Sequence, residues 1–144
     1  MIMPILTVKD VARSITFYEK IGFREQMALD DAQGVKNFAI VERGSLNIAL
    51  GVDETHEFDR YAPGVQFMIY LDPADQSIDD HHAQTVNNGI AIATELGTAY
   101  WGDRTYSITD PDGYFLTIAQ EHHAVDMEYV AKVHRGEAAP DKTE

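Results

Sequence analysis

One turn sequence between two strand-like runs constrains this chain more than any other feature. Asp110-Pro111-Asp112-Gly113 stands between residues 105–109 and 114–118, which have the composition of β-strands. Proline fixes φ and glycine permits a positive φ, so these four residues favour a tight turn and the segment predicts a β-hairpin. Residues 35–50 have the same arrangement around Glu42-Arg43-Gly44. The repetition indicates one structural unit written twice.

The first unit is predicted to span residues 1–51 in the order β-α-β-β-β. Residues 2–8 form an apolar run, and Asp10 follows it where it can cap the N-terminus of a helix that ends at Gly22. Three more strands are expected in the rest of the unit, at residues 23–29, 35–41 and 46–50.

The second unit, residues 64–120, repeats this order. Residues 65–71 predict its first strand, and Asp72 occupies the place that Asp10 holds in the first unit. A helix is expected at residues 75–88, with Ile78, His82 and Val86 on one side. Three strands are expected after it, one at residues 90–96 and two in the hairpin. Residues 52–63 read as a polar linker and residues 121–144 as a polar tail with a short helix.

The composition limits the classes of partner. The 144 residues include 11 basic and 24 acidic side chains, a formal net charge of −13, which argues against nucleic acid and anionic membranes and permits a cationic ligand. The sequence has no long apolar run and no signal-peptide pattern at its start, so we expect a cytoplasmic protein without membrane contact. Because there is no cysteine, a metal site would need His, Asp or Glu ligands.

The motifs resemble those of the vicinal oxygen chelate superfamily, which includes glyoxalase I, extradiol dioxygenases and bleomycin-resistance proteins. Residues 8–14 with Phe17-Tyr18 and Gly22-Phe23 resemble the opening of that family's first module, and Trp101-Gly102-Asp103-Arg104 with the hairpin turn resembles the end of its second. The resemblance covers about residues 2–120 and is strongest to the PhnB-like and bleomycin-resistance branches. It implies an α+β fold of two βαβββ modules whose eight strands form a curved mixed sheet.

The resemblance also implies where a divalent metal would be held, on the first and last strand of each module. Those positions fall at or next to Met3, Asn47, Gly64 and Thr117, and none of these residues is His, Asp or Glu. A hard divalent ion needs several converging oxygen or imidazole ligands. We therefore expect no metal and no other cofactor.

Several other polar motifs can be explained by a structural role as well as by a chemical one. Adjacent histidines on a helix point about 100° apart, so His81-His82 and His122-His123 are expected to be solvated surface residues rather than metal ligands. His56 is expected to be a loop residue rather than a base. Asp110 and Asp112 are expected to cap backbone amides of the turn rather than to act as an acid–base pair. No catalytic residue is identified.

A ligand site is the remaining possibility, lined by Trp101, Arg104, Phe38, Phe67 and Tyr106. Trp101 reads either as a packing residue or as one wall of a clamp for flat rings, with Arg104 or Asp103 as the polar contact. For Arg104 the alternative is an ion pair with Asp103, Asp110 or another carboxylate. Phe38, Phe67 and Met68 lie on strands that would line the two cups of the sheet.

Three function classes follow. The first is a metal-independent protein that binds a small, aromatic or cationic molecule, as in sequestration and resistance. The second is a lyase, dioxygenase or epimerase of the same superfamily with a relocated metal site. The third is a non-enzymatic PhnB-like subunit or regulatory partner. In each case we expect a homodimer, because a cupped sheet leaves strand edges and an apolar surface that one short chain covers poorly.

Overall fold

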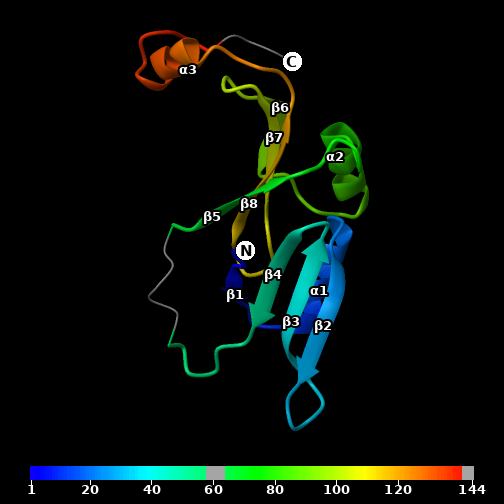
Figure 1. Ribbon diagram of the computed structural model, residues 1–144. Helices are drawn as coiled ribbons and strands as arrows, with labels where there is room; N and C mark the ends of the chain where they lie inside the picture. The colour runs from blue at the N-terminus through cyan, green and yellow to red at the C-terminus, as the bar shows by residue number, and fades with distance from the viewer. Residues whose placement is uncertain (58–63, 141–144) are drawn as a thin grey trace. The chain divides into compact units, whose positions relative to one another are not determined.

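The computed structural model describes residues 1–57 and 64–140 and divides the chain into two compact units (Figure 1). The first unit comprises Met1–Val65 together with Asp110–Tyr114, and the second comprises Gln66–Thr109 and Phe115–Glu144. Part of the predicted linker, residues 58–63, and the last four residues of the predicted tail lie outside the described residues.

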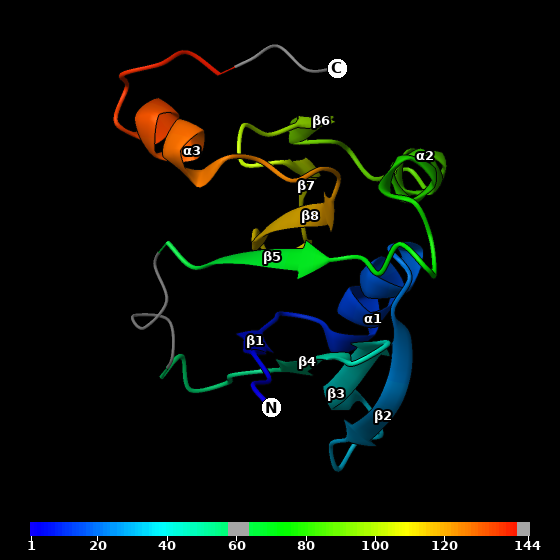
Figure 2. The same ribbon diagram turned by 45° about the horizontal axis from the view of Figure 1, so that its top comes forward.

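In its described residues, the first unit contains one helix and four strands in the predicted order β-α-β-β-β (Figure 2). Its strands pair in the spatial order β1-β4-β3-β2, with β1 parallel to β4 and the other pairs antiparallel. The elements are β1 (Ile5–Thr7), α1 (Val11–Lys20), β2 (Arg24–Asp30), β3 (Lys36–Arg43) and β4 (Leu46–Gly51).

Helix α1 forms where the sequence predicts it. Asp10 is the N-cap, and its carboxylate accepts a hydrogen bond of 3.0 Å from the backbone N–H of Arg13. Val11, Ile15 and Tyr18 recur at helical spacing and are buried. Tyr18 is completely buried and packs edge to face on Phe23 at 5.7 Å. This apolar stripe holds α1 on one face of the first sheet.

The second unit repeats the order and adds a helix at its end. Its strands pair as β5-β8-β7-β6, again with one parallel pair, β5 with β8. The elements are β5 (Gln66–Tyr70), α2 (Ile78–Asn87), β6 (Thr94–Thr98), β7 (Asp103–Thr109), β8 (Phe115–Glu121) and α3 (Met127–His134). The α+β fold with two βαβββ modules is confirmed, and the eight strands of residues 1–57 and 64–140 are hydrogen-bonded as two sheets of four.

Helix α2 departs from the prediction at its start and in its buried face. The N-cap is Ser77, whose hydroxyl accepts a hydrogen bond from the backbone N–H of Asp80, whereas Asp72 accepts one from Ala74 in the preceding turn. The buried residues of α2 are Ile78, His81 and Thr85. Val86, which was predicted on the buried side, is 48% exposed. The predicted stripe was therefore shifted around the helix.

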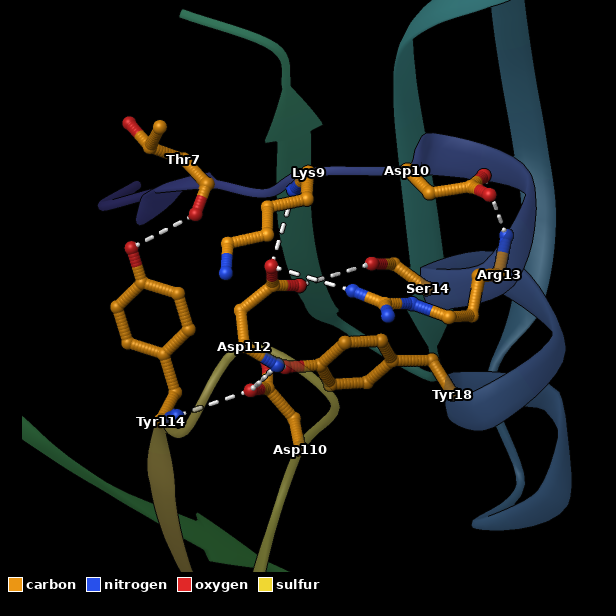
Figure 3. A network of polar contacts seen from close by, with 9 residues as sticks. All are labelled: Thr7, Lys9, Asp10, Arg13, Ser14, Tyr18, Asp110, Asp112 and Tyr114. Carbon is orange, nitrogen blue, oxygen red and sulfur yellow. Dashed lines mark hydrogen bonds and ion pairs between the residues drawn. The ribbon is translucent and has the colours of Figure 1, made fainter. Parts of the chain in front are cut away.

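The β7–β8 turn belongs to the first unit, and both of its carboxylates accept hydrogen bonds there (Figure 3). As predicted, Asp110 accepts hydrogen bonds from the backbone N–H groups of Asp112 and Tyr114, both at 2.9 Å. Its other oxygen accepts one from the hydroxyl of Tyr18, also at 2.9 Å. Burial raises the pKa of Tyr18, and the Asp110 charge and hydrogen bond raise it further.

Asp112 bonds to residues around the start of α1 (Figure 3). One of its carboxylate oxygens accepts hydrogen bonds from the backbone N–H of Lys9 at 2.9 Å and from the Arg13 guanidinium at 3.4 Å, and the other accepts one from the Ser14 hydroxyl at 3.4 Å. The hydroxyl of Tyr114 donates to a β1 carbonyl at 3.0 Å. The sequence pattern predicts that the carboxylates of this turn act as caps, but it does not predict that Asp112 contacts the start of α1.

Helix α3 lies in the predicted polar tail and has no buried residue. Its N-cap, Asp126, accepts a hydrogen bond of 3.0 Å from the backbone N–H of Glu128. None of the described helices is both long and apolar enough to span a membrane.

Candidate functional site

Helix α2 covers one face of the second sheet, and the other face carries half-exposed side chains such as Met68 and Tyr70. Arg104 and Tyr106 of β7 both hydrogen-bond side chains of α2, so the even-numbered residues of this strand lie on the helix side. Successive side chains of a strand alternate between faces, which puts Asp103 on the opposite side. We call that side the open face, and the strand pairing gives its members: Met68, Tyr70, Asp103, Thr105, Ser107, Thr117, Ala119 and Glu121.

Asp103 forms the polar centre of one end of the open face. It is only 8% exposed, and its Oδ2 accepts hydrogen bonds from the Tyr70 hydroxyl at 2.6 Å and from the Trp101 indole N–H at 3.1 Å. The hydrogen bond to Asp103 raises the pKa of Tyr70 to about 12, and burial adds to the rise. Both rings keep solvent-accessible surface, with Tyr70 47% and Trp101 39% exposed.

The turn before β7 fixes Trp101 in this position. Gly102 closes the turn with a backbone hydrogen bond to Ala99 and has φ of +99°. A Cβ on Gly102 would lie 2.3 Å from the carbonyl oxygen of His123, so only glycine fits. The Gly102 carbonyl also accepts two backbone N–H groups of the segment after β8. Tyr100 packs edge to face on the indole at 5.1 Å.

On the helix side, a buried polar cluster replaces the predicted exposed histidine. His81 is 1% exposed, and its Nδ1 lies 2.6 Å from the hydroxyl of Tyr106, which also lies 2.9 Å from the Thr85 hydroxyl. The expectation that His81 is a solvated surface residue is wrong, because the shifted stripe of α2 turns it inward and Tyr106 supplies a polar partner. His82 packs edge to face on the same Tyr106 ring at 5.0 Å.

Arg104 makes the ion pair that the sequence left open, and its partner is Asp79 of α2. The guanidinium donates three hydrogen bonds to this carboxylate, the shortest at 2.7 Å. These bonds hold the pKa of Asp79 below its ordinary value and raise that of Arg104. The pair lies on the helix side of the sheet, away from the open face.

The five predicted ligand-binding residues therefore lie in different surroundings. Trp101 reaches the open face of the second unit, whereas Arg104, Phe67 and Tyr106 lie on its helix side, Tyr106 fully buried. Phe38 belongs to the first unit, on the sheet face away from the buried Ala39–Leu50 pair. The structure thus does not gather the four residues of the second unit on one face of its sheet.

Sequence reasoning named Asp103 only as an alternative contact and missed Tyr70. Tyr70 could have been found from the alternation of side chains along a β-strand. Met68 and Tyr70 share one face of β5, and Phe67 lies on the other. Placing both Phe67 and Met68 in the cups of the sheet overlooks this alternation.

The residues at the implied metal positions do not fit a divalent ion. Continuing the β1–β4 register places Met3 opposite Asn47, whose buried Oδ1 has no hydrogen-bond partner within the described residues. In the second sheet, Thr117 pairs with Met68, and Gly64 precedes the start of β5. Thioethers, one amide and one hydroxyl are poor ligands for hard divalent ions.

The remaining acidic and histidine residues do not form a metal site either. Across residues 1–57 and 64–140, no group of three or more His, Asp or Glu side chains is close enough to hold a metal ion. His122 and His123 are exposed, as expected, and their rings lie 5.4 Å apart. His56 lies in an exposed loop with a φ of 56°.

Comparisons with known proteins agree with the fold. A model of the Glyoxalase/Bleomycin resistance protein/Dioxygenase superfamily matches residues 2–118. No curated protein sequence matches the chain.

Three solved structures illustrate the similarity. TioX from Micromonospora sp. ML1 is 19% identical, with 88% of this chain and 99% of TioX covered and a TM-score of 0.65. A glyoxalase-related enzyme from Clostridium phytofermentans is 21% identical, with 83% and 93% covered and a TM-score of 0.63. A bleomycin-binding protein in complex with bleomycin is 23% identical, with 83% and 97% covered and a TM-score of 0.61. At these identities the likeness concerns the fold.

Proposed function

Because the chain belongs to the glyoxalase/bleomycin resistance protein/dioxygenase superfamily, we propose that it binds a small molecule without a metal, as a sequestering protein does. A fold alone does not select one chemistry, so the residues of the site carry the choice. The observation that carries it is Thr117, which stands at an implied metal position of the second module and pairs with Met68 of β5. A hydroxyl and a thioether there favour contact with an organic guest over coordination of a hard ion.

The composition of the open face supports an aromatic guest. Trp101 and Tyr70 offer half-exposed rings, and Met68, 48% exposed, offers a flexible apolar side chain beside them. Asp103 adds one polar group among these apolar surfaces, which is the usual composition of a small-molecule site. We keep Trp101 as the proposed wall of this site.

The likeness to a bleomycin-binding protein suggests the first compound to test. Metal-free bleomycin should bind the purified protein in the presence of EDTA, as measured by isothermal titration calorimetry. Elemental analysis after dialysis should find much less than one divalent metal per chain. A stoichiometric bound metal, or turnover of a substrate that EDTA abolishes, would instead support the enzyme alternative.

We also propose a homodimer, because each unit exposes apolar side chains on the face that its helix does not cover. Ile5 is 68% and Leu29 53% exposed in the first unit, and Met68 and Tyr70 are half-exposed in the second. Covering such a surface is a common reason for self-association. Sedimentation equilibrium at micromolar concentration should give twice the chain mass, and a single-chain mass would refute the dimer.

A further inference from the structure

We propose that Asp103 receives a protonated amine of the ligand, with the rings of Trp101 and Tyr70 beside it. This inference rests on the small-molecule function proposed above and names the class of guest: a flat aromatic compound that carries an ammonium group. Three observations on the open face support it.

The first observation is the unused side of a buried carboxylate. Both hydrogen bonds to Asp103 come from neutral groups and go to Oδ2, so within the described residues Oδ1 has no donor. Oδ1 keeps contact with solvent, so the ammonium group of a ligand can reach it. The neighbouring Arg104 is on the other face, where Asp79 binds it in a bidentate ion pair. The chain thus leaves the ionic partner of Asp103 to be supplied from outside.

The second observation is the arrangement of the aromatic groups. The Trp101 indole and the Tyr70 phenol both donate to Oδ2, so both rings lie next to this carboxylate. Each ring is still half-exposed. An ammonium group that donates to Oδ1 can therefore approach a ring face as well, and cation–π attraction adds to the charge-assisted hydrogen bond.

The third observation is a second carboxylate directly across the strand pair. Glu121 of β8 pairs with Asp103 of β7, so the two side chains share the open face. Like charges at directly opposite positions destabilise a sheet. The Glu121 charge also contributes to the raised pKa of Tyr70. In the described part of the chain, neither carboxylate forms a salt bridge with Lys or Arg. A bound cation would relieve this repulsion.

The test compares two probes that differ in one group. 1-Naphthylmethylammonium carries the charge, and 1-naphthalenemethanol has the same ring with a neutral hydroxyl. Their dissociation constants are measured calorimetrically with wild-type protein and with Asp103→Asn, which keeps the shape and a hydrogen-bond acceptor but removes the charge. Wild type should prefer the ammonium probe by about tenfold, the scale of one charge-assisted contact. Asp103→Asn should bind the two probes within about twofold of each other.

Two further variants separate this contact from general charge and from misfolding. Asp79→Asn removes one negative charge from the helix side of the same unit and should keep the wild-type preference. Asp80→Asn removes the charge of an exposed α2 residue outside the proposed site, and it should keep the preference as well. Circular dichroism and thermal unfolding check that each variant folds. If Asp103→Asn fails to fold, Glu121→Gln takes its place and should reduce the preference by about threefold, since Glu121 acts at longer range.

The outcomes separate this inference from the function on which it rests. Equal binding of both probes by wild type overturns the amine contact and leaves small-molecule binding standing. A preference that survives in Asp103→Asn, or that falls equally in Asp79→Asn, also overturns it, because the effect would then be one of net charge. Binding of neither probe overturns the amine contact together with the proposed aromatic guest.

Discussion

The two ends of strand β7 carry buried carboxylates in opposite situations. At one end, every carboxylate oxygen of Asp110 and Asp112 accepts a hydrogen bond, and the donors include backbone amides, hydroxyls and the Arg13 guanidinium. At the other end, Asp103 accepts two hydrogen bonds on one oxygen, both from side chains that are themselves half-exposed.

The difference distinguishes a carboxylate that maintains the fold from one that is available to a ligand. A buried polar group with all its partners stabilises a structure, and its removal leaves those partners unsatisfied. The partners of Asp103 can turn to water when it is removed, so its loss should affect binding more than stability. Substitutions at the two ends should therefore give opposite patterns.

The largest effect is expected for Asp110→Ala. The variant leaves the fully buried Tyr18 hydroxyl and two backbone N–H groups without their acceptor, and should lower the free energy of unfolding by about 3 kcal/mol. Asp103→Ala, the matched change at the other end of β7, should cost about 1 kcal/mol or less because its donors can reach water. Urea denaturation measures both. Equal losses would remove the distinction between the two ends.

The second effect is a dependence on alkaline pH that originates from Tyr18. Its pKa is raised in the folded protein, so the unfolded chain releases this proton first once the pH exceeds the ordinary tyrosine value near 10. The stabilisation is complete below that pH and should then fall by about 1.4 kcal/mol for each further pH unit. Urea denaturation at several alkaline pH values should show a steeper decline for wild type than for Tyr18→Phe. Parallel declines would contradict the buried, neutral Tyr18.

Trp101→Phe should affect binding and leave stability nearly unchanged. The substitution keeps a ring but removes the indole N–H that bonds Asp103 and part of the stacking surface. Binding of 1-naphthylmethylammonium should weaken by about 1 kcal/mol. The only tryptophan also reports on the site directly, so its fluorescence should change as the probe is added. Unchanged affinity and an unresponsive, blue-shifted emission would make Trp101 a packing residue.

The smallest effect is expected for Arg104→Gln. Its partner Asp79 is more than half exposed, so the ion pair resembles surface pairs, and its loss should cost about 0.5 kcal/mol. The ammonium preference should not change, because Arg104 lies on the helix side of the sheet. A large loss of binding would return Arg104 to the ligand site.

The sequence predicted the repeated units well because each of their signals is local. The Asp10 cap, the apolar stripe of α1 and the turn at Asp110 depend on residues within a few positions of one another. The buried face of α2 was mispredicted because its start depends on Ser77, and because the burial of His81 requires Tyr106 from a distant strand.

The candidate site was predicted less well for a related reason. An aromatic-rich segment around Trp101 is visible in the sequence, but which neighbours share its face depends on strand register. The pairing of β5 with β8 brings Tyr70 to Asp103, and residues 33 positions apart give no local sign of this contact. Alternation along β7 then separates Asp103 from Arg104, although the two are adjacent in the sequence.

The most direct test of metal-independent binding is one calorimetric titration performed in two buffers. 1-Naphthylmethylammonium is added to the dialysed protein, once with EDTA and once with a divalent ion such as Mn²⁺, Ni²⁺ or Zn²⁺. The two dissociation constants should agree within about twofold, since the residues at the implied metal positions offer no adequate ligand set. Binding that appears only with the metal present would contradict the proposed function.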